Sequence, residues 1–245
     1  MSELGGAIKG ISDYSDERHK NWCIHCGSVL SAVDSNLDHV PSKCILDKPF
    51  PENLPTVRIC SPCNSSFSND EEYFIAFLEA VHPREIDLGQ QGARRAERVL
   101  SNNIRLQDEI VEQIKLEKDA DGNDRVAIAP DITRIHNVVV KNARGHIMYE
   151  HGTPAFGEPT SIAVLPLSTL SSEARRIFEV IDYGSVWPEV GSRLMSRLVS
   201  GKGMLSDGWV IVQPNIYRFA VIDNGRLVVR TVVHEFLATE TIWEY

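Results

Sequence analysis

The chain has 245 residues, of which 42% are hydrophobic and 24% charged, an ordinary composition for a globular protein with one large domain or two small ones. The formal net charge of −9 argues against a surface that binds nucleic acid over its whole extent, although it leaves room for a local basic patch. No apolar run approaches the ~20 residues that span a bilayer, and the first residues lack the basic and apolar blocks of a secretory signal. We therefore expect a cytoplasmic protein with no membrane partner.

The sequence divides into four segments, and together they predict an α+β fold. Residues 1–20 are polar and predict an N-terminal arm. Residues 21–82 hold every cysteine and predict a small metal-stapled unit. Residues 83–124 predict a linking helix region, and residues 125–245 predict a C-terminal α+β domain of unknown role with antiparallel strands.

Within the cysteine-bearing segment we expect a hairpin followed by a helix. Val29, Ser31 and Val33 occupy alternate positions, and the following Asp-Ser-Asn supplies turn residues, so a short hairpin is predicted within residues 27–40. The proline-rich stretch after it predicts a loop up to a strand over residues 56–59. From Ser61 onward the pattern becomes helical, and apolar residues recur at helical spacing at Tyr73, Phe74, Phe77 and Leu78.

Residues 93–118 carry an amphipathic pattern that predicts one long helix. Arg94, Arg98 and Arg105 share a face of that helix and are weak candidates for contacts with nucleic-acid phosphates. Neighbouring acidic residues favour the alternative of a solvated, charge-balanced face.

The C-terminal segment mixes strands with short helices. Residues 134–152 could form either a helix or a strand, whereas the stretch after Pro166 predicts a helix with a polar start. Residues 208–236 alternate in the manner of antiparallel strands, and Asp-Asn-Gly at 223–225 predicts a hairpin turn. The histidines of this segment are scattered and suggest no set of metal ligands.

The five cysteines predict a structural metal site. Four of them form two Cys-x-x-Cys pairs, and an odd total in a cytoplasmic protein argues against a disulfide framework. Four thiolates in a tetrahedron suit Zn²⁺, and such closed sites stabilise a fold. A redox role would need a βαβ context that the pattern lacks. The expected ligands are Cys23, Cys26, Cys60 and Cys63.

Between and beside these pairs lie residue types that phosphodiester hydrolysis requires. A divalent ion must balance the developing negative charge, and a general base must take a proton from water. Asp38 and Asn64 carry hard oxygen donors that suit Mg²⁺ or Mn²⁺, and the adjacent His39 can act as the base. Taken singly, each residue has a plainer alternative, such as a turn for Asp38-His39 or a helix cap for Asn64.

The order Cys-x-x-Cys, Asp-His, Asn-Leu, Cys-x-x-Cys-Asn resembles the HNH endonucleases, over roughly residues 21–80. The resemblance implies a ββα-metal fold in which a hairpin and a helix surround one catalytic ion. It implies that Asp38 and Asn64 hold this ion, that His39 is the general base, and that Asn53 braces the loop and orients the histidine. A basic residue often follows the last motif position, but here no Lys or Arg occurs between Asn64 and Arg84.

The sequence therefore predicts an endonuclease that depends on Mg²⁺ or Mn²⁺, with Ni²⁺ as a further candidate, and that acts on nucleic acid, with DNA expected. By analogy, such chains belong to mobile elements or antiphage defence, and the C-terminal domain would serve specificity, dimerisation or a regulatory partner. The alternatives are a catalytically degenerate zinc module that binds nucleic acid or protein, and an interaction protein that acts through its C-terminal domain.

Overall fold

The structure is a computed structural model and describes residues 8–81, 101, 103–118, 124–184, 187–202 and 207–244. The chain forms two compact units, the first made of Met1–Ser66 with Val139–Tyr245 and the second of Phe67–Val138. Both combine helices with antiparallel strands, so the expected α+β class is confirmed.

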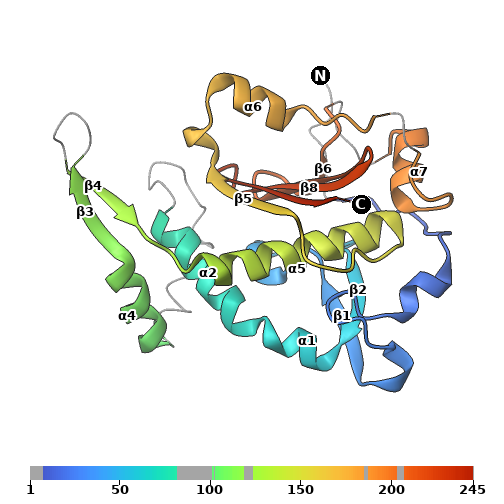
Figure 1. The fold of residues 1–245 in the computed structure, drawn as a ribbon, viewed down its shortest axis with the longest axis horizontal. Coiled ribbons are helices and arrows are strands. Elements are labelled where there is room, and N and C mark those ends of the chain that lie inside the picture. The colour runs from blue at the N-terminus through green and yellow to red at the C-terminus, as the bar shows by residue number, and fades with distance from the viewer. Residues whose placement is uncertain are drawn as a thin grey trace. The chain divides into compact units, whose positions relative to one another are not determined.

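A five-stranded antiparallel sheet with the order β5-β9-β8-β7-β6 lies at the centre of the first unit (Figure 1). Its strands are β5 (Ser161–Pro166), β6 (Val210–Gln213), β7 (Tyr217–Asp223), β8 (Arg226–Val233) and β9 (Leu237–Glu244). The hairpin turn predicted at residues 223–225 joins β7 to β8 and is confirmed. Gly225 takes a φ of 92° there, a conformation that favours glycine.

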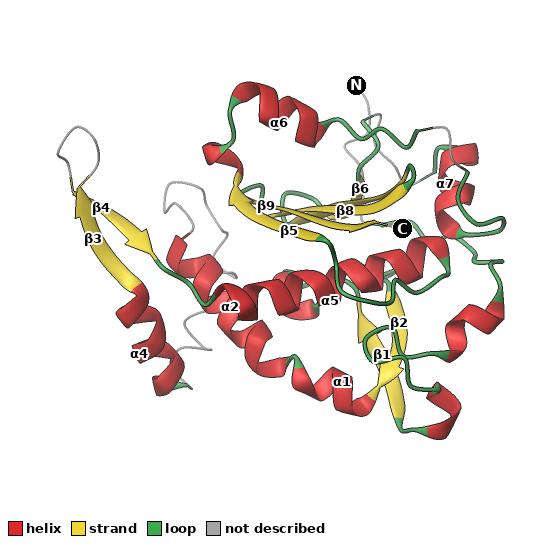
Figure 2. Ribbon diagram, viewed as in Figure 1, coloured by secondary structure: helices red, strands yellow, loops and turns green. Residues whose placement is uncertain are grey.

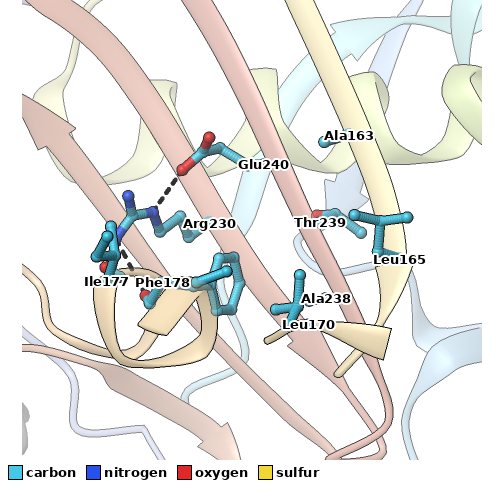
Figure 3. A pocket seen from close by; sticks show the side chains of 10 residues that line it. Ala163, Leu165, Leu170, Ile177, Phe178, Arg230, Ala238, Thr239 and Glu240 are labelled. Carbon is cyan, nitrogen blue, oxygen red and sulfur yellow. Dashed lines mark hydrogen bonds and ion pairs between the residues drawn. The ribbon is translucent and has the colours of Figure 1, made fainter. Parts of the chain in front are cut away.

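Helices cover both faces of this sheet, as Figure 2 shows. The predicted helix after Pro166 is α6 (Ser172–Glu179), and the ring of its Phe178 lies 5.7 Å from that of Trp209 on one face. On the other face lies α5 (Ile132–His151) from Val139 onward, where His146 stacks on Phe219 at a centroid distance of 3.8 Å. The range that the sequence left open is therefore a helix.

Short helices complete the first unit: η1 (Glu17–Asn21), η2 (Leu30–Ala32), η3 (Lys43–Ile45), α1 (Ser61–Ser66), η4 (Leu167–Thr169) and α7 (Arg193–Ser200). Arg193 at the start of α7 holds the N-terminal segment. Its guanidinium donates to the carbonyl of Ile11 at 3.1 Å and to the carboxylate of Asp13 at 3.0 Å. The described part of the N-terminal segment thus packs against the rest of the unit.

The cysteine-bearing segment contributes a two-stranded sheet, β1 (Ser35–His39) paired antiparallel with β2 (Thr56–Cys60). The hairpin predicted within residues 27–40 is therefore wrong, whereas the strand predicted over 56–59 is confirmed. The physical reason is burial. Val29 and Val33 are 38% and 40% exposed, but Val57 and Ile59 of β2 are 6% and 0% exposed. The apolar face belongs to β2, and β1 pairs with it.

The second unit comprises α2 (Ser68–Val81), α4 (Ile104–Gln113), β3 (Ile114–Lys118), β4 (Asp124–Ile128) and the first turns of α5. The apolar positions predicted for α2 are buried. Tyr73 links three elements: its hydroxyl donates to Gln113 at 2.6 Å and accepts from the backbone N–H of Asp131 at 2.7 Å. The guanidinium of Arg134 pairs with Asp70 and Glu109.

The long helix predicted over residues 93–118 is wrong at its C-terminal end. The helix stops at Gln113, and the next five residues form β3, which pairs antiparallel with β4. Ile114 and Leu116 alternate with charged residues at a period of two, which suits a strand better than a helix. Residues 82–100 lie outside the described part. Among the residues that the structure describes, no helix is long and apolar enough to cross a membrane.

Candidate metal centre and polar site

Four cysteines from the two ends of the cysteine-bearing segment converge in the first unit, as predicted: Cys23, Cys26, Cys60 and Cys63. Their sulfur atoms all lie within 4.8 Å of one another, and the Sγ atoms of Cys26 and Cys60 are 3.6 Å apart. A tetrahedral ion with metal–sulfur distances of ~2.3 Å separates its ligands by about 3.8 Å. The cluster could therefore hold a structural metal such as zinc.

Local structure positions both pairs. The first pair lies in a tight turn in which the Cys23 carbonyl accepts from Gly27 at 2.8 Å and the Cys23 N–H donates to Ser28 at 2.8 Å. Gly27 has a φ of 71°, which glycine adopts without strain. In the second pair, Cys60 ends β2 and Cys63 lies in α1. A metal here would tie the turn to the strand–helix junction.

The thiols have divergent acidities. Burial and the crowding of neighbouring sulfur atoms raise the pKa of Cys63, and burial also raises the pKa of Cys60. Hydrogen bonding to Ser28 lowers the pKa of Cys26 to about 6. A cation among the four sulfur atoms would offset the repulsion between thiolates and favour their deprotonated forms.

Asp38 and His39 end β1, opposite Val57 and Thr56 of β2. Successive strand residues point to opposite faces, so the same expectation holds for this pair. The carboxylate of Asp38 forms an ion pair with a buried lysine of α5. The Nζ of Lys141 lies 2.9 Å from Oδ2 and 3.2 Å from Oδ1 of Asp38.

Asn64 lies in α1 and contacts β1 through Asn36. Its Nδ2 donates to the Oδ1 of Asn36 at 3.0 Å. Asn36 and Asp38 are two positions apart on the strand and therefore share a face. Asn64 is thus held over the face of β1 from which Asp38 projects.

His39 is partly buried, and its Nδ1 is a buried atom without a hydrogen-bond partner in the described part of the chain. Burial lowers the pKa of its imidazole, and the positive charges of Lys43 and Lys141 lower it further, whereas Asp38 acts in the opposite direction. The lowered pKa favours the neutral form of the ring, in which one nitrogen can accept a proton.

The other predicted residues lie on a loop, on α4 and outside the described range. Asn53 is exposed on the loop between β1 and β2, next to the N-terminal segment: a Cβ built on Gly10 would lie 3.2 Å from its Oδ1. Arg105 is exposed on α4 in the second unit. Arg94 and Arg98 lie outside the described residues.

The sequence did not place Lys141, Ser42 and Asn142 beside Asp38. The Nζ of Lys141 donates to the Ser42 hydroxyl at 2.8 Å, and the Ser42 N–H donates to the Oδ1 of Asn142 at 2.9 Å. The available signal was the run Lys-Asn-Ala-Arg between the apolar residues at 138–140 and 147–149. Polar side chains at buried helix positions need partners, and these partners lie about 100 residues away.

No protein-family model, no curated protein and no solved structure matches the chain.

Proposed function

We propose that the protein is a metal-dependent endonuclease of the HNH type, acting on DNA. The observation that carries this proposal is the arrangement around β1. An Asp-His pair ends a strand whose partner, β2, leads through two cysteines into α1, and α1 brings an asparagine back to β1. This strand pair and helix, joined by a four-cysteine cluster, resemble the ββα-metal unit of the HNH family.

Zn²⁺ is the ion proposed for the four-cysteine cluster. All donors are thiolates, which favour zinc over magnesium or calcium, and a fourfold protein set leaves no position for a substrate. Its role would be to fix the start of α1, and with it Asn64, relative to the strands.

In the proposed reaction, His39 accepts a proton from a water molecule that attacks the phosphorus atom. The bond to the leaving oxygen then breaks and one strand of the substrate is cut. Asp38 and Asn64 would hold a Mg²⁺ or Mn²⁺ ion, which supplies positive charge against the charge that develops on the phosphate and the leaving oxygen. The neutral imidazole of His39 suits this role, because a protonated ring could not accept the proton.

One observation favours a second candidate function, a degenerate zinc module that binds nucleic acid or protein without chemistry. The carboxylate proposed for the catalytic ion is already compensated by Lys141. A lysine that fills a cation site permanently would abolish the chemistry while preserving the fold.

Plasmid nicking with Mg²⁺, Mn²⁺ or Ni²⁺ separates the two candidates. We expect nicking by the wild-type protein and a loss of about 10²–10⁴-fold in His39→Ala, the usual contribution of a general base. The metal content of the four-cysteine cluster should stay unchanged. His136→Ala, which changes a histidine in the second unit, is the matched control and should nick at the wild-type rate. Absence of nicking by the wild type with every metal would favour the module.

A further inference from the structure

A buried lysine lies against the proposed catalytic carboxylate. The side chains of Lys141 and Asp38 are only 3% and 13% exposed, and the ammonium contacts both carboxylate oxygens. The same ammonium donates to Ser42, whose backbone N–H and hydroxyl both contact the side-chain oxygen of Asn142. A buried charge is tolerated only with partners of this kind, so the ammonium is part of the built structure around Asp38.

The helix that carries this lysine is held very close to the end of β1. Gly145 lies one helical turn after Lys141 and therefore on the same face of α5. A Cβ built on Gly145 would lie 2.6 Å from the Cγ2 of Val40, the residue that follows His39. The absence of a side chain at Gly145 thus permits the close approach that brings the ammonium of Lys141 to Asp38.

We infer that Lys141 competes with the catalytic divalent cation for Asp38, so that the protein binds this cation weakly until nucleic acid supplies a phosphate. This inference rests on the proposed function. The proposed donor set contributes one carboxylate and one neutral amide, and the ammonium already balances the carboxylate. A divalent cation that enters this set adds uncompensated positive charge at short range.

A phosphodiester restores the charge balance. Its negative charge attracts both the divalent cation and the ammonium, so cation binding and nucleic-acid binding strengthen each other. By linkage the two affinities change by the same factor, commonly about 5–150-fold. Lys141 would also supply a positive charge next to the scissile position, where the sequence after Asn64 offers none before Arg84.

Mn²⁺ binding to the zinc-loaded full chain, followed by the electron paramagnetic resonance signal of free Mn²⁺, tests the inference without using activity. We expect Lys141→Met to bind Mn²⁺ about tenfold or more tightly than the wild type, because the competing charge is gone. Lys141→Arg keeps the charge and should stay within about twofold of the wild type. Lys43→Met is the matched control: it removes an exposed lysine near His39 and should have a small effect, because water screens its charge.

A second arm uses the site with Lys141 intact. In His39→Ala, which should slow cleavage about 10²–10⁴-fold, duplex DNA should tighten Mn²⁺ binding about tenfold or more. The inference is overturned if Lys141→Met leaves the Mn²⁺ affinity unchanged, if Lys43→Met has an equal effect, or if DNA does not alter Mn²⁺ binding. Should Lys141→Met fail to fold, the DNA arm still decides. If the wild type cleaves DNA with Mn²⁺ but shows no coupling, only this inference fails. If it neither binds Mn²⁺ with DNA nor cleaves, the proposed function fails as well.

Discussion

His146 projects from α5 onto the five-stranded sheet, where its ring stacks on Phe219 and its Nε2 lies 3.0 Å from the Tyr217 hydroxyl. Complete burial lowers the pKa of this imidazole to about 3. The unfolded chain, with an ordinary histidine pKa near 6.5, therefore binds a proton that the folded chain excludes. The stabilisation is fully present above pH 6.5 and is lost as the pH falls toward 3.

We predict that this one histidine removes about 2 kcal/mol from the free energy of unfolding between pH 7 and pH 5. His146→Gln keeps a polar partner for the Tyr217 hydroxyl but cannot take up the proton. Urea unfolding at both pH values should show a smaller loss for this variant than for the wild type. An equal loss in both proteins would mean that His146 is not buried as a neutral ring.

Gly145 of α5 lies so close to Val40 that a larger side chain would not fit. Alanine is the better helix former by about 1 kcal/mol, but its Cβ would meet the buried Val40 at 2.6 Å. The Val40 side chain branches at Cβ and cannot move aside. We therefore expect the clash to outweigh the gain in helix propensity. Gly145→Ala should lower the free energy of unfolding by about 1–3 kcal/mol in urea titrations.

A second substitution isolates the cause of that loss. Val40→Ala removes both Cγ atoms that lie near Gly145. In this background Gly145→Ala should cost close to nothing, and the difference is the interaction energy of a double-mutant cycle. Additive losses would show that close approach of α5 to β1 is not the reason for glycine at this position.

The four-cysteine cluster includes both ends of the junction from β2 to α1, since Cys60 ends β2 and Cys63 lies in α1. We predict that Cys60→Ser reduces the metal content from about one ion per chain to near zero, because a closed site needs all four donors. Several kcal/mol are lost with the ion, and the melting temperature should fall by about 10 °C or more in a chain of this size. Metal analysis and thermal unfolding measure both effects.

Cys44→Ser is the control for that prediction, because it removes a thiol that lies outside the cluster. It should retain the metal. Equal metal loss in both variants, or retention of the metal by Cys60→Ser, would contradict a four-sulfur site.

Among the helices and strands, the sequence predicted those whose local pattern agrees with their burial. Thr56–Cys60 alternates and buries its apolar face, and the stretch from Ser61 onward has helical spacing. The predicted hairpin within residues 27–40 failed because alternation at Val29 and Val33 does not reveal that both side chains remain exposed. The helix at Ile132–His151 could not be assigned, because its buried polar residues are satisfied by distant partners.

The candidate site was predictable only in part for the same reason. Spacing alone indicates the four cysteines, and the Asp-His pair stands out by residue type. Lys141 and Asn36 are contributed by tertiary contacts and carry no local motif. A sequence shows which side chains can bind an ion, whereas the long-range packing of α5 decides which charge lies beside them.

The first unit is built from two separate stretches of the chain, Met1–Ser66 and Val139–Tyr245. The apolar cluster around the cysteine-bearing segment includes Met148 and Tyr149 of α5 together with Ile24, Val40 and Ile59. The loop between β1 and β2 is held by Gln213 of β6, whose side-chain amide accepts from the backbone N–H of Asp47 and donates to its carbonyl, both at 2.9 Å.

We therefore predict that a fragment of residues 21–82 does not fold independently, even with zinc. It lacks the helix that fills its core and the lysine that balances Asp38. Its amide NMR spectrum should be poorly dispersed, whereas the full chain should give a dispersed spectrum. A well-dispersed spectrum from the zinc-loaded fragment would show that the cysteine-bearing segment is autonomous.

We expect the first unit to bind two ions, one held by sulfur and one exchangeable. Anomalous diffraction from crystals of the zinc-loaded protein soaked in saturating Mn²⁺ would locate both. We expect a zinc peak among the four cysteine sulfur atoms and a manganese peak about 2.2 Å from oxygens of Asp38 and Asn64, a usual distance for oxygen ligands. A zinc peak alone, with Asp38 still paired to Lys141 at saturating Mn²⁺, would show that the protein lacks the exchangeable cation site.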